Sequence, residues 1–402
     1  MIGLRLIHRL ATASVVLMLL CGPVRAQELG LRISASHSIQ HDSNLFRLSP
    51  DSDPFTVLGR SSTSERLDIS ALRVQYKSQF SLQAVDLDLT LVEYDYQLYD
   101  RLDLLARNYD IRWNWAFTPR LRGTIRAERD SSVGSFDDAQ AIASSNQRLR
   151  RSEMVDASYE LDGAWRLLLA AQRTQNRFDQ PQLGEDGTSV RSAEAGIRFD
   201  ASSGSVASLR LRKGSGRTLA TQTLAVSDTD DFEESEWLMN LRWQTSGKTV
   251  ATASLVHVSR DHTQAPTRDF SGTSASISTS WEPSAKSLWT LRWSSELSAY
   301  STIGSNTART NRFALTYAWS IGPRTRLRLG LTESRLRLSN PPLGEALNPL
   351  RNTTRERSLG LQWEPTRNVA VEAALVNSRR LSNLADQRFS NLQASASVTL
   401  LY

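Results

Sequence analysis

The chain has 402 residues, 40% of them hydrophobic and 22% charged, and its formal net charge is +6. This apolar fraction is too high for a disordered chain, and 20 Gly with 12 Pro are too few for a collagenous or low-complexity one. A mean hydropathy of −0.38 excludes a bundle of transmembrane helices, which need about 20 consecutive apolar residues each. It permits a transmembrane β-barrel, because barrel strands alternate apolar and polar residues.

Residues 1–26 have the pattern of a cleaved secretory signal peptide. A basic start precedes an apolar stretch at 10–20, which is too short to cross a bilayer, and Val24-Arg25-Ala26 ends the segment with a cleavage pattern. An uncleaved anchor helix is the alternative. We expect 27–402 to form one domain. Loss of the signal removes the only cysteine, Cys21, so the mature chain has no disulfide, zinc–thiolate site or thiol nucleophile.

The charged residues do not form a basic patch. Arginine supplies 44 of the 48 basic residues, and the 42 acidic residues are interspersed with them along the chain. A nucleic-acid-binding protein concentrates its basic residues on one face or helix. We therefore expect no nucleic-acid partner.

Alternation of apolar and polar residues recurs along nearly the whole chain. Such a period of two predicts β-strands with one apolar face. It is clearest at 109–117, 121–127, 237–243, 313–321, 327–331 and 392–402. Near Ala71-Leu72 and Ala84-Val85 the phase slips by one residue, which predicts β-bulges. No segment after the signal has a convincing amphipathic helical pattern, which argues against an α/β fold.

The connections between these strands alternate between short and long. Short turns are predicted at 77–79, 118–120, 162–164, 201–204, 245–248, 282–286, 322–325 and 364–368. Long polar loops are predicted at 41–64, 130–151, 175–188, 214–234, 261–269, 301–310, 340–354 and 379–387. Outer-membrane barrels have this asymmetry, with short periplasmic turns and long extracellular loops.

The prediction is an all-β fold: a single transmembrane antiparallel up-and-down β-barrel of about 18 strands. The first strand covers 29–39 and the last ends at Tyr402. The turns recur about every 40 residues, which also suits a solenoid or a propeller. Neither fits the uneven loop lengths, and no residue motif recurs.

Aromatic residues crowd the predicted short turns. Trp and Tyr are enriched at membrane–water interfaces, so we expect an interfacial girdle; the alternative is the core of a soluble sandwich. The final strand is amphipathic and ends in an aromatic residue, a pattern that the barrel-insertion machinery of the outer membrane recognises. The interfacial candidates are Tyr76, Trp115, Phe117, Trp243, Trp281, Trp319, Trp363 and Tyr402.

The polar phase of the strands is predicted to line the lumen and is rich in arginine. Guanidinium groups pair with carboxylates and phosphates, so these arginines favour contact with anionic solutes. The alternative is that they pair with acids such as Asp86, Asp88 and Asp110 and stiffen the wall. The candidates are Arg112, Arg122, Arg126, Arg210, Arg212, Arg242, Arg292, Arg326 and Arg328.

No enzymatic site is predicted. His257 and His262 lack the spacing of a metal site or a catalytic triad, and the chain has no phosphate-binding Gly-rich loop or nucleophile elbow. We expect no metal and no cofactor. The acidic pairs Asp137-Asp138 and Glu233-Glu234 fall in predicted loops; they are expected to be solvated, with calcium or lipopolysaccharide bridging as the alternative.

The segment His41-Asp42-Ser43-Asn44-Leu45-Phe46-Arg47-Leu48 resembles an early motif of the EpsL-type outer-membrane proteins, which are encoded with exopolysaccharide biosynthesis and are similar to β-barrel porins. Weaker similarity continues at 109–121 and 129–150, and the resemblance is clearest over 29–165. Its motif residues here are Asp42, Asn44, Phe46 and Arg47. The resemblance implies a role in exporting or organising a polysaccharide and supplies no catalytic residue.

The sequence thus leads to the hypothesis of a passive outer-membrane pore for exopolysaccharide export. The alternatives are a diffusion porin for small anionic solutes and a purely structural barrel. The expected partners are outer-membrane lipid, lipopolysaccharide, the insertion machinery, and possible polysaccharide and periplasmic export components. The length and composition of the chain do not distinguish among these functions.

Overall fold

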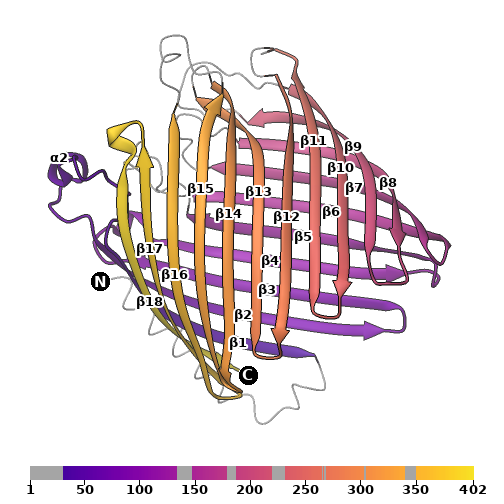
Figure 1. Ribbon diagram of the computed structural model, residues 1–402, viewed down its shortest axis with the longest axis horizontal. Coiled ribbons are helices and arrows are strands. Elements are labelled where there is room, and N and C mark those ends of the chain that lie inside the picture. Colours follow the sequence, from indigo (N-terminus) through magenta and orange to yellow (C-terminus); the bar gives the residue numbers. More distant parts are fainter. Residues whose placement is uncertain are drawn as a thin grey trace.

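The protein is a closed barrel of 18 antiparallel β-strands, seen in a computed structural model that describes residues 30–133, 147–178, 187–219, 231–264, 266, 269–302, 305–339 and 350–402. Each strand pairs with its neighbours in sequence, and β18 pairs with β1 to close the cylinder. Figure 1 shows the strands of the front wall, β10–β18, running steeply across those of the back wall, as expected for strongly tilted barrel strands. The predicted signal peptide, 1–26, lies outside the described residues.

The strands of the first half are β1 (Leu31–Asp42), β2 (Glu65–Phe80), β3 (Gln83–Tyr96), β4 (Leu104–Ala116), β5 (Leu121–Val133), β6 (Gln147–Asp162), β7 (Trp165–Phe178), β8 (Gly187–Asp200) and β9 (Val206–Leu219). The second half contains β10 (Asp231–Ser246), β11 (Thr249–His262), β12 (Phe270–Ser284), β13 (Ser287–Thr302), β14 (Ser305–Gly322), β15 (Thr325–Ser339), β16 (Arg351–Thr366), β17 (Val369–Ser382) and β18 (Phe389–Leu401).

Helical structure is confined to three short segments among the described residues: α2 (Pro54–Leu58), η1 (Asp100–Leu102) and η4 (Ala385–Gln387). Asp53 caps α2 by accepting hydrogen bonds from the backbone of Phe55 and Thr56. The Thr56 hydroxyl donates a further bond to Asp53 at 2.6 Å, and this bond lowers the pKa of the Asp53 carboxyl. Within the described chain, no helix has the length and apolar character needed to cross a membrane.

All short connections lie at one end of the barrel, here called the short-turn end, and the other connections lie at the long-loop end. Seven of the eight predicted short turns coincide with observed turns. The prediction at 77–79 is wrong, because these residues continue β2 and the turn lies at Ser81-Leu82, where Ser81 has a φ of 55°. The connection at 97–103, which contains η1 and brings the strand number to 18, is not among the predicted loops.

The strands extend further toward the long-loop end than predicted. Residues 305–310, predicted as loop, belong to β14, and 351–354 belong to β16. The reason is that both faces of the strands are polar there, so alternation of apolar residues ends before the hydrogen-bonded ladder does. Ladder pairing is set by backbone hydrogen bonds and continues without an apolar face.

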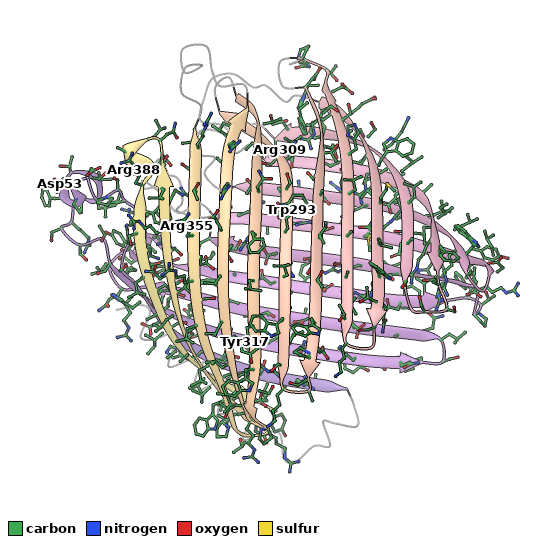
Figure 2. The ribbon with its side chains drawn as sticks, in the orientation of Figure 1. Asp53, Trp293, Arg309, Tyr317, Arg355 and Arg388 are labelled. Atoms are coloured by element: carbon green, nitrogen blue, oxygen red, sulfur yellow. The ribbon has the colours of Figure 1, made fainter. Side chains whose placement is uncertain are left out.

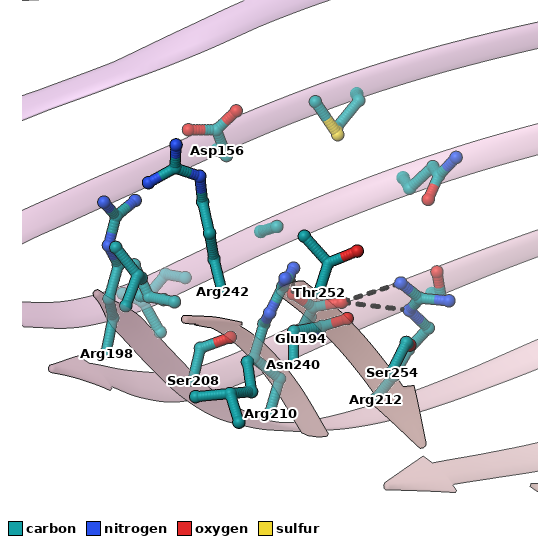
Figure 3. A pocket seen from close by; sticks show the side chains of 18 of the residues that line it. Asp156, Glu194, Arg198, Ser208, Arg210, Arg212, Asn240, Arg242, Thr252 and Ser254 are labelled. Atoms are coloured by element: carbon teal, nitrogen blue, oxygen red, sulfur yellow. Dashed lines mark hydrogen bonds and ion pairs between the residues drawn. The ribbon is translucent and has the colours of Figure 1, made fainter. Parts of the chain in front are cut away.

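The large apolar side chains of each strand share the outer face of the barrel. Leu169, Leu211, Trp237 and Leu331 are typical, each 46–61% exposed. The opposite phase carries most of the paired acids and arginines, whose side chains converge within the cylinder (Figure 3). The fold therefore has an apolar exterior and a polar interior, the reverse of a soluble protein.

The two phase slips in the sequence are not bulges. The β2–β3 register runs without interruption from Leu67↔Tyr96 to Phe80↔Gln83. Leu67 and Ile69 instead point to the inner face, where they pack under the first long loop. The apolar residues change phase because this part of the inner wall is covered by protein.

Candidate functional site

The candidate site is the inner face of the barrel, where all nine predicted lumen arginines lie. They share the phase opposite to the exposed apolar residues of their own strands; Arg210 and Arg212, for example, flank Leu211. All nine lie in the half of their strands nearest the short turns. The prediction of an arginine-bearing inner wall thus agrees with the strand phases, and the ion pairs then divide the nine into two groups.

Four of the nine pair with carboxylates. Arg126 on β5 forms a two-pronged contact with Asp110 on β4, Nε to Oδ1 at 2.8 Å and Nη2 to Oδ2 at 3.0 Å. Arg112 approaches the same carboxylate at 3.3 Å. This matches the alternative considered from the sequence, in which arginines brace the wall across strands.

A second ion-pair cluster crosses three strands. Glu194 on β8 accepts from Arg210 at 3.0 Å and from Arg212 at 2.8 Å, and Arg212 also contacts Glu236 on β10 at 2.8 Å. The Glu194 side chain is only 9% exposed. Each carboxylate here fixes guanidinium groups in a charge-assisted geometry.

This cluster borders a cavity of about 620 Å³ on the inner wall of β6–β12. Figure 3 shows Asp156, Arg198, Arg210 and Arg242 directed toward the same space. Four arginines and two carboxylates line it, with hydroxyl and amide groups of the remaining polar residues between them. Asp200 and Glu236, outside the lining, pair with two of these arginines, Arg198 at 2.6 Å and Arg212 at 2.8 Å, and the cavity offers several guanidinium hydrogen-bond donors.

The other five predicted arginines make no ion pair with a carboxylate of the described chain. Arg242 donates to the backbone oxygen of Gly204 at 3.0 Å, and Arg328 donates to Gln362 at 3.1 Å. Their guanidinium groups are thus not held by carboxylates of the described residues. These five are Arg122, Arg242, Arg292, Arg326 and Arg328.

Sequence reasoning missed several members of this wall. Arg198 and Asn240 line the cavity, and Glu194 organises two of its arginines. Arg198 lies between Ile197 and Phe199, both exposed on the outer face, so alternation alone was sufficient to find it. Glu194 could not be assigned as a bridge, because strand register was required to place it beside Arg210 and Arg212.

The residues of the family-like motif hold the first long loop to the barrel. The backbone N–H of Asn44 donates to Asp42 at 2.9 Å and to Asn391 of β18 at 3.0 Å. The Asn44 side chain exchanges hydrogen bonds with the backbone of Leu48, both at 2.9 Å. Arg47, which has a φ of 56°, pairs with Asp42 at 3.0 Å.

Apolar side chains complete this attachment. Phe46 is 1% exposed and contacts the Tyr99 ring edge-on, with centroids 4.8 Å apart. Leu45 and Leu48 belong to the same cluster, which packs on the inward residues Leu67 and Tyr96. Burial raises the pKa of the Tyr99 hydroxyl. The loop therefore covers the inner face at the long-loop end, on the side of β1–β3 and β18.

All eight predicted interfacial aromatics lie on the outer face toward the short-turn end. Tyr317 extends this group by stacking against Trp289, with ring centroids 4.4 Å apart. Figure 2 shows Tyr317 toward the short-turn end of β14, far from Arg309 near the other end. The eight are Tyr76, Trp115, Phe117, Trp243, Trp281, Trp319, Trp363 and Tyr402.

The described histidines lie apart. His37 contacts Ser70 at 3.2 Å on β1–β2, and His257 contacts Thr273 at 3.0 Å on β11–β12. Within the described residues, no group of three or more His, Cys, Asp or Glu side chains could hold a metal ion. The predicted acidic pair Glu233-Glu234 belongs to β10 rather than to a loop, and Arg260 pairs with Glu234. Asp137-Asp138 lies outside the described residues.

The fold and its polar interior define a closed, antiparallel up-and-down β-barrel. The solved structures most like it include OccK2 (OpdF) of Pseudomonas aeruginosa, with a TM-score of 0.54, 11% identity, and coverage of 92% of this chain and 98% of that one. OpdK of the same organism, solved with vanillate, has a TM-score of 0.52 and 9% identity, covering 92% and 99%. OccAB3 of Acinetobacter baumannii has a TM-score of 0.51 and 8% identity, with the same coverage.

At these identities the similarity is one of fold. No family model matches the sequence, and no curated protein matches it. The expectation of a single 18-stranded antiparallel up-and-down barrel is confirmed.

Proposed function

We propose that the protein is an outer-membrane channel that passes small anionic solutes by diffusion. The observation that carries the proposal is the inner wall, where Arg122, Arg242 and Arg292 form no ion pair with a carboxylate of the described residues. An 18-stranded barrel is wide enough to enclose an aqueous channel. The apolar exterior with an aromatic group at one end suits a bilayer.

The structural neighbours support the choice of solute. OccK2 has been solved with glucuronate and OpdK with vanillate, and both ligands are carboxylates. A carboxylate accepts two parallel hydrogen bonds from a guanidinium group. The cavity beside Arg198, Arg210 and Arg242 provides such donors in this chain.

Exopolysaccharide export, the main hypothesis from the sequence, receives no support from the comparisons. Its basis was the motif at 41–48, whose side chains here bond to one another and to β18. These contacts give the motif a structural role in holding the loop. An unchanged amount of exported polymer after deletion of the gene would remove this hypothesis entirely.

The direct test is conductance of the purified full chain in a planar lipid bilayer under a KCl gradient, with glucuronate as the solute probe. We expect discrete channels, a reversal potential on the anion side, and flux of glucuronate. Replacing Arg122, Arg242 and Arg326 together with Gln is expected to move the reversal potential toward cations. Absence of conductance from correctly folded, heat-modifiable protein would refute the proposal.

A further inference from the structure

The outer face carries an arginine cluster whose charges the protein does not neutralise. Arg129 on β5, Arg151 on β6, Arg173 on β7 and Arg191 on β8 share the phase of the exposed apolar residues of those strands. None of the four forms an ion pair with a described carboxylate, and the buried Nε of Arg129 has no hydrogen-bond partner. We refer to these four residues as the outer arginine cluster.

The strand register brings like charges directly opposite one another. Arg129 lies directly opposite Arg151 in the β5–β6 register, and Arg173 lies directly opposite Arg191 in the β7–β8 register. Directly opposed like charges destabilise a sheet. Glu153, the acid opposite Arg173, is the nearest outward acid on these strands and forms no ion pair with any described residue. The arrangement is unfavourable for the isolated protein and favourable for a protein that binds a polyanion.

The cluster lies immediately beyond the apolar surface, on its long-loop side. Ile125, Val155, Leu169 and Ile197 occupy the same face of the same strands, closer to the short turns. A shallow cavity of about 530 Å³ next to the cluster is lined by Arg173 and Arg191, and also by Arg217, Asp231 and Glu233, of which Arg217 and Asp231 pair at 2.8 Å. An amphiphile with acyl chains along the apolar surface places its headgroup at these guanidinium groups.

The width of the cluster matches a headgroup with more than one phosphate. Adjacent strands lie about 4.8 Å apart, and Arg173 is offset by two residues from the position opposite Arg151, so the outermost arginines lie about 16 Å from each other. Figure 1 shows these strands side by side in one wall. Guanidinium groups bind phosphate through paired hydrogen bonds.

We propose that the outer arginine cluster binds the phosphorylated headgroup of a glycolipid in the outer leaflet of the membrane. The inference rests on the proposed membrane location, but it concerns the outside of the barrel and is independent of conduction. A free inorganic anion satisfies the same guanidinium chemistry but not the adjacent apolar surface, and the experiment below separates the two.

The other wall supplies a matched control. On β15 and β16, Arg335 and Arg355 also lie on the outer face toward the long-loop end, but Glu333 pairs with them at 2.6 Å and 2.9 Å. Figure 2 labels Arg355 on this wall. Because Glu333 holds both guanidinium groups, their loss should matter little to a phosphorylated lipid, although Arg379 lies opposite Arg355 on the same face.

The experiment measures binding of a bis-phosphorylated, acylated disaccharide lipid to the full chain in a zwitterionic detergent by native mass spectrometry. The comparison ligands are the dephosphorylated lipid and inorganic phosphate. We expect wild-type protein to retain only the phosphorylated lipid. The variant Arg129→Gln/Arg151→Gln/Arg173→Gln/Arg191→Gln should bind it about 600-fold more weakly, because each arginine near an anionic lipid surface contributes about fivefold. Arg335→Gln/Arg355→Gln should bind as wild type does.

Equal retention of the phosphorylated and the dephosphorylated lipid by wild-type protein would overturn the proposal. This comparison uses no variant, so its result does not depend on whether a variant folds. Full competition by inorganic phosphate at millimolar concentration would show a simple anion site and overturn the lipid assignment. Equal weakening by the control variant would show that general surface charge is responsible, which also refutes it. Bilayer conductance of the four-residue variant is expected to remain unchanged, so failure of the channel proposal is seen separately.

Discussion

Replacing Glu194 with Gln should make the lumen more selective for anions. The side chain is nearly buried, lies beside the 620 Å³ cavity and holds Arg210 and Arg212. Gln keeps the size of the side chain and one acceptor oxygen but removes the negative charge. The formal charge around the cavity then becomes more positive by one unit, and part of the hydrogen-bonding capacity of both guanidinium groups becomes available to a solute.

The size of the effect follows from Coulomb's law. A unit charge about 7 Å from a monovalent anion in water changes its energy by about 0.6 kcal/mol, which is about threefold in local concentration. At an ionic strength of about 0.1 M the Debye length is about 10 Å, and screening reduces the gain to about 1.7-fold. The anion-to-cation permeability ratio should therefore increase modestly at this salt concentration and more strongly at lower salt.

The assay is the reversal potential of single channels in a bilayer, measured at two salt concentrations. Glu153→Gln is the control, because it removes the same charge from the outer face of the adjacent part of the wall. The reasoning is wrong if Glu194→Gln leaves the reversal potential unchanged at low salt. It is also wrong if the Glu153 variant shifts it equally.

Two further predictions concern the wall and the first loop. Phe46→Ala should release the loop at 43–64, since truncating a buried Phe costs about 3–5 kcal/mol, and limited proteolysis should then cut this loop. The Phe55 side chain is 66% exposed, so Phe55→Ala should leave the digestion pattern as in wild type. Resistance of both variants to proteolysis would contradict the packing of Phe46. Gly123→Ala should lower the free energy of unfolding by about 1–3 kcal/mol and so lower the urea midpoint, because the added Cβ would lie 1.9 Å from the Asp156 backbone oxygen and 2.6 Å from the Trp115 ring. In the control Gly360→Ala the added Cβ meets nothing closer than 3.9 Å, so equal midpoints for the two variants would refute the argument.

The barrel could be predicted because its two faces meet different media. Along β14 and β15 the alternation of large apolar and polar residues identifies strands, and short turns such as the one at 323–324 separate them. Alternation no longer marks the strands where this contrast ends. Leu67 and Ile69 point inward because the first loop covers them, and the polar long-loop parts of the strands have no apolar face to mark them.

The site could be predicted only as a set of residues. Period two assigns Arg210 and Arg292 to the same face, but pairing depends on register and on which strands are neighbours. The sequence therefore could not separate the arginines bound by Asp110 and Glu194 from Arg122 or Arg326. For the same reason the outer arginine cluster was not found, since its members fall one per strand and far apart in the chain.

Closure of the cylinder joins segments from opposite ends of the chain. Ile33 and Tyr402 exchange backbone hydrogen bonds of 3.0 Å and 2.8 Å, and nine residue pairs connect β1 with β18. Every other strand pairing joins neighbours in sequence, whereas the pairing of β1 with β18 must bring together residues separated by most of the polypeptide, at a large entropic cost. Assembly thus passes through an open, curved sheet in which β1 and β18 are unpaired edge strands, each able to pair with a strand of another chain. Such a molecule requires a folding factor that shields both edge strands until β18 pairs with β1.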